Sequence, residues 1–229
     1  MNIPDLCFLS AVAGALLLGA SGPVCAEALR DGFVRVRDVV PDVILDIRYY
    51  GGDNFVGARI DSYDAPEAIL TREAAGALKK AADDLGKLGY RIKIFDAYRP
   101  ASAVAHFVRW AADVGDVRMK DAYYPDIDKR DLFKRGFIAA KSGHSRGSAI
   151  DLTIVDKAGV EADMGSPFDF FGPISAPGSG LVTPEQRKNR DILRNAMLSN
   201  GFGPLSTEWW HFTLEKEPYP DTYFDFPVI

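Results

Sequence analysis

The chain has 229 residues, of which 47% are hydrophobic and 11% aromatic, so it can bury a core without disulfide bonds. It carries 27 basic and 32 acidic residues, and the resulting net charge of −5 argues against a nucleic-acid partner bound through bulk positive charge. The aromatic content argues against an intrinsically disordered chain. For this length, one domain is expected.

The N-terminal segment predicts export from the cytoplasm. It has no charged side chain from Leu6 to Ala26, and the apolar run Leu6–Ala20 is typical of the hydrophobic region of a secretory signal peptide. Small residues stand at Val24 and Ala26, so cleavage is expected after Ala26. Residues 1–26 are then the signal peptide, and residues 27–229 form the mature domain.

Cleavage would make the protein periplasmic or secreted, with no stable membrane association. Both cysteines, Cys7 and Cys25, would leave with the signal, so the mature chain would contain no thiol and no disulfide. The alternative is an uncleaved anchor, because an uncharged stretch of this length could nearly span a bilayer. Met1–Asp5 contains no lysine or arginine, which is unusual for a signal peptide.

The first third of the mature chain predicts short strands and a long helix. Alternating apolar residues predict strands at Val34–Val36 and at Val43–Ile47. A helix is expected to open at Asp64–Pro66 and to end at Gly86 or Gly89. Its apolar residues recur at helical spacing: Ile69, Leu70, Ala74, Ala77, Leu78, Ala81 and Leu85.

The middle of the chain predicts a strand at Arg91–Tyr98 and then a helix from Pro100 to about Ala112. Residues 113–141 are rich in Asp, Lys and Tyr and are expected to be irregular. A further strand is predicted at Ala149–Val155, followed by a turn near Lys157–Gly159.

The last third begins with the Gly- and Pro-rich segment Gly165–Leu181, which is expected to form a loop over a cleft. Thr183 and Gln186 form the pattern of a capping box, with proline at the first helical position, and predict a helix to about Asn200. A final strand is expected at Glu208–Glu215. These elements together predict an α+β fold.

The chain has only three histidines, and two of them belong to a candidate metal site. In the strand at 149–155, Asp151 faces away from the apolar residues, and His211 does the same in the final strand. If the two strands are neighbours, Asp151 and His211 meet, and the turn before Asp151 can bring His144 beside them. Two imidazoles, one carboxylate and an open fourth position form a catalytic zinc arrangement, and the mature chain offers no thiolate for a structural one.

Other interpretations apply to each of these residues. Asp151 could lie on a solvated face, and His106 is an ordinary helix histidine among apolar neighbours. Glu208 stands beside two tryptophans, where a carboxylate that activates water is a reasonable role. In a straight strand, however, Glu208 and His211 would point to opposite faces, so Glu208 must lie at the strand's end or at a bulge.

The motifs containing these residues resemble the zinc D-alanyl-D-alanine dipeptidases of the vancomycin-resistance type. The segment Ser142–Thr153 (SGHSRGSAIDLT) and the segment Glu208–Phe212 (EWWHF) are similar to that family. Further similar segments are Tyr49, Asp53–Phe55, Phe95–Pro100, Tyr123–Asp128 and Tyr223–Pro227. The resemblance covers the chain from about Asp42 to its end. It implies one domain with a central antiparallel sheet flanked by helices, of the D,D-peptidase and hedgehog-like kind.

The resemblance also implies roles for individual residues. One zinc ion per chain would be held by His144, Asp151 and His211. Catalysis would use Glu208 as general base and Arg99 to stabilise the oxyanion, while substrate would be bound by Asp169, Ser142 and Tyr49. Gly143 departs from the family, where a second serine is common, as does the Gly- and Pro-richer segment after Gly172.

Three functions remain open at this stage. The first is hydrolysis of free D-alanyl-D-alanine, a small-molecule substrate. The second is a zinc D,D- or L,D-carboxypeptidase or endopeptidase that trims peptidoglycan stem peptides. The third is a non-catalytic zinc module that binds cell wall, against which the presence of both Glu208 and Arg99 argues. A carboxylate at Asp169 that holds a free ammonium favours the first over the second.

Overall fold

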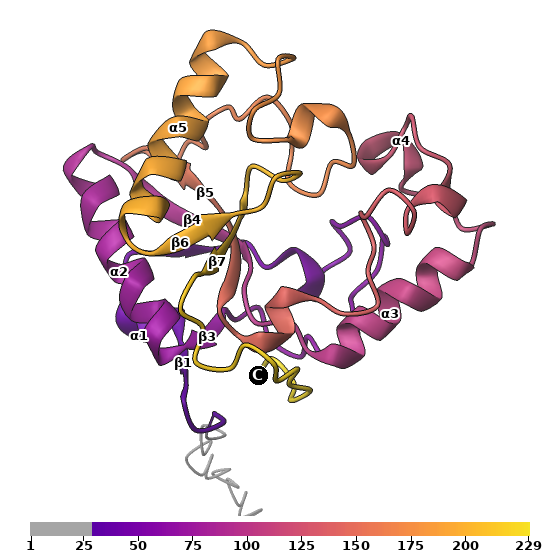
Figure 1. Ribbon diagram of the computed structural model, residues 1–229, viewed down its shortest axis with the longest axis horizontal. Helices are drawn as coiled ribbons and strands as arrows, with labels where there is room; N and C mark the ends of the chain where they lie inside the picture. The colour runs from indigo at the N-terminus through magenta and orange to yellow at the C-terminus, as the bar shows by residue number, and fades with distance from the viewer. Residues whose placement is uncertain (1–28) are drawn as a thin grey trace, which may run out of the picture.

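The computed structural model describes residues 29–229, so the predicted signal peptide lies outside the described residues. A mixed five-stranded sheet has the strand order β2-β4-β5-β7-β6, and four of its strands, β4 to β7, are labelled in Figure 1. Its strands are β2 (Ile44–Leu45), β4 (Arg91–Asp96), β5 (Ala149–Val155), β7 (His211–Leu214) and β6 (Phe202–Pro204). The expectation of an antiparallel sheet holds for three of its four pairings, because edge strand β2 runs parallel to β4.

A second sheet of two strands corrects the predicted start of the long helix. Strand β1 (Phe33–Arg35) pairs antiparallel with β3 (Ile69–Thr71), so the helix begins only at Arg72. The apolar residues at 69 and 70 fit a helix and a strand equally well, and pairing with β1 decides for the strand. Thr71 ends the strand and caps the helix, with its hydroxyl accepting a hydrogen bond from the Ala74 N–H.

The strand predictions near the N-terminus were partly wrong. Val36 starts a single helical turn, α1 (Val36–Val39), instead of continuing β1. Only Ile44–Leu45 of the predicted strand Val43–Ile47 pairs with a neighbour, and a 3₁₀ turn follows at Arg48–Tyr50. That turn places the Tyr49 side chain in the interior, where it is 1% exposed.

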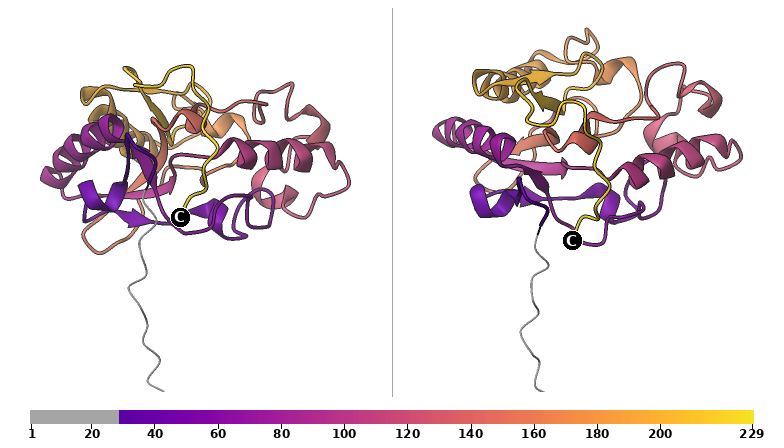
Figure 2. Two further views of the ribbon diagram at one scale, coloured as in Figure 1. Left: turned by 90° about the horizontal axis from the view of Figure 1, so that it is seen from below. Right: turned by 60° about the horizontal axis from the view of Figure 1, so that its bottom comes forward.

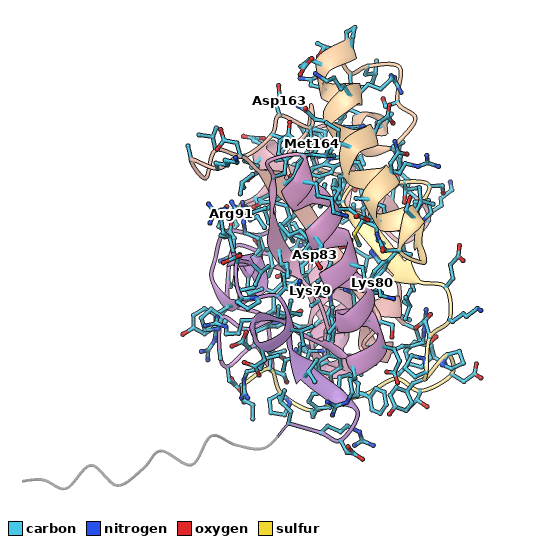
Figure 3. The ribbon with its side chains drawn as sticks, turned by 90° about the vertical axis from the view of Figure 1, so that its left-hand side faces the viewer. Lys79, Lys80, Asp83, Arg91, Asp163 and Met164 are labelled. Atoms are coloured by element: carbon cyan, nitrogen blue, oxygen red, sulfur yellow. The ribbon has the colours of Figure 1, made fainter. Side chains whose placement is uncertain are left out.

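Helices α2 (Arg72–Lys87) and α5 (Pro184–Ser199) lie side by side along one side of the main sheet (Figures 1 and 3). Helix α5 has the predicted capping box: the Thr183 hydroxyl accepts from the Gln186 N–H, and the Gln186 amide oxygen accepts from the Thr183 N–H. Apolar side chains of both helices are buried: Ala74, Ala75, Leu78, Ala81, Leu85, Leu193, Ala196 and Met197.

Helix α3 (Ala101–Ala112) begins after Pro100 as predicted and lies on the other side of the molecule (Figure 2). The expected irregular segment after it contains only the short helix α4 (Lys120–Tyr123) and a 3₁₀ turn at Lys129–Asp131. None of the helices in residues 29–229 is both long enough and apolar enough to cross a membrane.

The strands that carry the candidate site have the predicted alternation. Strand β5 has the predicted bounds, and all seven of its residues are buried. Strand β7 begins at His211, so Glu208 precedes the strand instead of lying within it. This shorter strand removes the conflict between the positions of Glu208 and His211.

Candidate active site

Three elements bring the candidate metal ligands together. His144 lies on a 3₁₀ turn, Gly143–Arg146, just before β5, while Asp151 is inside β5. The register of β5 and β7 places Asp151 directly opposite His211. The predicted convergence of His144, Asp151 and His211 is confirmed, since their ligand atoms all lie within 4.8 Å of one another.

Four side-chain atoms of this cluster lie close to one another. Nε2 of His144 lies 3.0 Å from Nδ1 of His211 and 3.2 Å from Oδ2 of Asp151. Nδ1 of His211 lies 3.0 Å from Oδ1 of Asp151. His144 and Asp151 are each 2% exposed, so these groups are largely removed from water.

The hydrogen bonds of His144 indicate that the cluster fits a cation. Nδ1 of His144 lies 2.7 Å from the Ala97 carbonyl oxygen, which can only accept, so this nitrogen carries the proton. In the neutral ring, Nε2 then carries an unshared lone pair that is directed at Asp151 and His211. Such an arrangement is stabilised by a positive charge at its centre, and nitrogen and oxygen donors suit a divalent metal.

In the absence of a metal, the same arrangement shifts the pKa values of His211 and Asp151. Burial alone would lower the pKa of His211, but the hydrogen bond to Asp151 and its charge raise it. Burial would likewise raise the pKa of Asp151, yet the two imidazoles hold it well below its usual range. Asp151 is therefore ionised at neutral pH, as a metal ligand must be.

Glu208 lies beside the cluster in a half-buried position before β7. Burial and the nearby charge of Asp151 raise the pKa of Glu208 to about 7, although His211 and Arg99 oppose this shift. A carboxylate with a pKa near neutrality can both accept and release a proton at physiological pH.

Arg99 extends toward the same cluster from the segment after β4. Its Nη2 lies 2.8 Å from Oδ2 of Asp96 and 3.5 Å from Oδ2 of Asp151. The guanidinium also lies 4.9 Å from the ring centre of Tyr49 and 5.2 Å from that of Phe107. These contacts restrict the orientation of the guanidinium beside the cluster.

Asp96 is a part of the site that sequence reasoning missed. It is fully buried, accepts from Nε of Arg99 at 2.9 Å and accepts from the Tyr63 hydroxyl at 2.5 Å. A charged residue at the end of an apolar strand, three positions before Arg99, was the available signal. Its role depends on Tyr63, whose place beside β4 the sequence does not reveal.

Asp169 is a buried carboxylate with unused hydrogen-bonding capacity. It is 6% exposed and accepts from the Tyr49 hydroxyl at 2.8 Å, and no lysine or arginine among residues 29–229 forms an ion pair with it. Burial and the charge of Asp151 raise its pKa well above the ordinary value. The backbone φ of Asp169 is 59°, a left-handed conformation that non-glycine residues rarely adopt.

All eight residues predicted from the sequence line one cavity of about 400 Å³. Ser142 lines its wall and accepts from the His144 N–H at 3.2 Å. Sequence reasoning missed the aromatic wall formed by Phe137 and Phe171, whose stacked ring centres are 5.0 Å apart. The predicted loop 165–181 contributes Asp169 and Phe171 to the cavity.

The third histidine stays outside the site, as predicted. His106 lies on α3, where its Nδ1 is 2.9 Å from Oδ1 of Asp61. It is therefore a natural control for the two histidines of the cluster.

The chain is similar to known proteins over most of its length. A peptidase family model described as D-Ala-D-Ala dipeptidase matches residues 30–229. A D-alanyl-D-alanine dipeptidase of Enterococcus faecium is 41% identical over 198 residues, which are 86% of this chain and 98% of that protein.

Two further relatives bear the same name. The D-alanyl-D-alanine dipeptidase of Streptomyces coelicolor is 40% identical over 86% of this chain and 98% of its own length. That of Escherichia coli is 34% identical over 80% of this chain and 84% of its own length. The chain therefore belongs to the D-Ala-D-Ala dipeptidase family of metallopeptidases.

Proposed function

We propose that this protein hydrolyses D-alanyl-D-alanine to two molecules of D-alanine and uses one zinc ion per chain. The observation that carries the proposal is one cavity that is lined by the His144–Asp151–His211 cluster, Glu208 and the buried Asp169. Metal ligands, a proton acceptor and a buried carboxyl group, which a substrate ammonium would keep ionised, suit a small zwitterionic substrate in a cavity of about 400 Å³.

The donor set supports zinc as the metal. Two imidazole nitrogens and one carboxylate, with a fourth position open, are the ligands of many catalytic zinc sites. When bound there, zinc would supply Lewis-acid polarisation of a carbonyl oxygen and make a coordinated water more acidic. The hydrogen bond from Nδ1 of His144 to the Ala97 carbonyl would keep Nε2 directed at the metal.

Glu208 would move the proton during hydrolysis. Its carboxylate would accept a proton from the attacking water and then deliver it to the nitrogen of the leaving D-alanine. Without a metal the pKa of Glu208 is about 7, and the positive charge of a bound zinc ion would lower it and so favour the carboxylate form that accepts the proton.

Arg99 would stabilise negative charge on the carbonyl oxygen of the scissile bond. Its guanidinium is permanently charged and is held by Asp96 before any substrate binds, so little reorganisation is needed. The aromatic rings of Tyr49 and Phe107 on which it rests shield this charge from water.

Asp169 would bind the free ammonium of the substrate. The Tyr49 hydroxyl hydrogen-bonds one oxygen of Asp169, which leaves the other oxygen available. Because Asp169 is buried, its position supports a substrate that ends there over a peptide that continues. This favours the dipeptidase over a carboxypeptidase acting on stem peptides. Ser142, on the cavity wall, would contact the dipeptide backbone.

We further propose that the fold is of the D,D-peptidase and hedgehog-like kind and that the enzyme acts on cell-wall peptides in the periplasm or outside the cell. The antiparallel pair β5–β7 that carries two metal ligands supports the fold assignment. The apolar segment before Ala26 supports export.

A substrate panel tests the proposed activity. The purified mature protein, loaded with zinc, is expected to cleave D-alanyl-D-alanine faster than L-alanyl-L-alanine, N-acetyl-D-alanyl-D-alanine or a muropeptide. A preference for the muropeptide would instead favour the carboxypeptidase.

A further inference from the structure

Arg190, on α5, is buried but has no acidic partner. Its side chain is 4% exposed, and among residues 29–229 no carboxylate forms an ion pair with it. Its three nitrogens donate to three backbone carbonyls instead: Nε to Met164 at 2.7 Å, Nη1 to Ala176 at 2.9 Å and Nη2 to Ile174 at 3.0 Å. Met164 is labelled beside the upper half of α5 in Figure 3.

Such a contact set needs an arginine. A planar guanidinium donates from three separate nitrogen atoms held in one plane, whereas lysine offers its three donors from a single nitrogen. Burial lowers the pKa of Arg190 to about 10, so the group remains charged at neutral pH. A buried cation without an acidic partner is costly, but an apolar side chain in its place would leave the three carbonyls without these donors. The three carbonyls therefore explain why a cation is placed there.

The segment that Arg190 holds, residues 164–176, carries Asp169. Within this segment the Ser175 hydroxyl donates to the Phe170 carbonyl oxygen at 2.6 Å, which closes the loop behind Asp169. The left-handed backbone of Asp169 is a conformation that persists only where surrounding contacts enforce it. Arg190 donates hydrogen bonds to backbone carbonyls at both ends of the segment that contains Asp169.

The same segment is bound to the residue beside Glu208. The Trp209 N–H donates to the Ser175 carbonyl oxygen at 2.9 Å, and its indole Nε1 donates to the Ser166 hydroxyl at 3.0 Å. The guanidinium of Arg190 also lies 5.8 Å from the centre of the Trp209 ring. Displacement of the segment would therefore move the backbone that presents Glu208.

We propose that Arg190 is a positioning residue that fixes Asp169 and Glu208 relative to the metal ligands. It does not line the cavity, so it acts through the carbonyls of residues 164–176 and not by touching the substrate. This inference rests on the roles proposed above for Asp169 and Glu208.

The test compares Arg190→Lys and Arg190→Met with the wild-type zinc enzyme, using Arg187→Met as the control. Arg187 is also on α5 and donates to a backbone carbonyl, that of Ser179, outside the segment that carries Asp169. Lysine keeps the charge and most of the stem but cannot reach three carbonyls. Both Arg190 variants are expected to bind one zinc while kcat/KM falls by about 10- to 100-fold, because a small misplacement of catalytic groups has effects of this size.

The decisive readout is discrimination against the N-acetylated dipeptide. If Arg190 places Asp169, the ratio of kcat/KM for D-alanyl-D-alanine to that for its N-acetyl derivative falls in both Arg190 variants and stays at the wild-type value in Arg187→Met. In Arg190→Ala, added guanidinium at millimolar concentration is expected to restore part of kcat/KM.

Other outcomes would overturn the inference. Wild-type kcat/KM in Arg190→Lys would be one such outcome. Another would be a loss of activity with an unchanged preference for D-alanyl-D-alanine over its N-acetyl derivative and no rescue by guanidinium. That result would mean that Arg190 only stabilises the fold. Asp169→Asn separates this inference from the proposed function. If Asp169→Asn leaves discrimination unchanged, the proposed role of Asp169 fails, whatever the Arg190 variants do.

Discussion

Nε2 of His144 lies 3.0 Å from Nδ1 of His211, a separation at which two nitrogen lone pairs repel unless a proton or a metal ion lies between or beside them. The Ala97 carbonyl keeps the proton of His144 on the opposite nitrogen. The local hydrogen bonding is therefore arranged for a cation before one binds.

Removing His211 should remove the metal. Purified His211→Ala is expected to lose stoichiometric zinc, since two ligands remain of three, whereas His106→Ala should keep one zinc per chain. Affinity should also fall as acid protonates the imidazoles, because only neutral rings bind metal. Metal analysis after dialysis measures both. Full zinc in His211→Ala would refute the ligand assignment.

Glu208→Gln should separate catalysis from metal binding. The variant keeps all three ligands and should retain its zinc, but kcat should fall on the order of 10²- to 10⁴-fold because no group moves the proton. Glu215→Gln, an exposed residue just after β7, is the matched control and should behave as wild type. Steady-state kinetics with metal analysis tests this, and near-normal kcat in Glu208→Gln would exclude it as the base.

Asp169→Asn should act mainly on KM. The substrate ammonium is present in the ground state and in the transition state, so loss of its partner weakens both equally. N-acetyl-D-alanyl-D-alanine should show the same loss in the wild-type enzyme. Equal rates for the free and acetylated dipeptides would point to a carboxypeptidase instead.

The metal-free protein should lose stability as pH rises toward 7. The folded state holds a proton on Glu208 up to a pKa of about 7, whereas the unfolded chain releases it near 4.5. Between these values the folded state binds more protons, so the free energy of unfolding falls with rising pH. The raised pKa of Asp169 acts in the same direction.

Glu208→Gln identifies the contribution of Glu208 to this loss. Between pH 4.5 and 8, the free energy of unfolding should fall by about 3 kcal/mol less in the variant than in the wild type, because the shift in pKa from 4.5 to about 7 is lost. Urea denaturation with a chelator at both pH values measures the difference. A parallel fall in both proteins would show that Glu208 does not titrate in this range.

The mature protein should begin at Glu27. N-terminal sequencing of protein from a periplasmic or secreted fraction tests the predicted cleavage after Ala26. Intact Met1 on cytoplasmic protein would contradict export, and intact Met1 on membrane-bound protein would indicate an uncleaved anchor.

Local patterns were enough to predict much of the site. Strand β5 and the capping box of α5 depend on residues close together in the chain, and both occur where the sequence places them. Alternation along β5 and β7 also predicted that Asp151 and His211 would share a face, a property that follows from strand geometry alone.

Contacts between distant segments were not accessible in this way. Strand β3 looked like the first turn of a helix because its partner β1 lies far back along the chain, with Arg35 paired to Ile69. The part played by Asp96 depends on Tyr63, and that of Arg190 on three carbonyls whose positions are set by tertiary structure.

Because Asp151 pairs with His211, metal binding depends on the register between β5 and β7. A slip of one residue between β5 and β7 would turn His211 to the opposite face and leave only two ligands together. Metal binding would then favour the native pairing over every slipped alternative. A deletion or insertion of one residue inside β7 would abolish metal binding even where the sheet still forms, while a change of length in an outer loop would leave it intact.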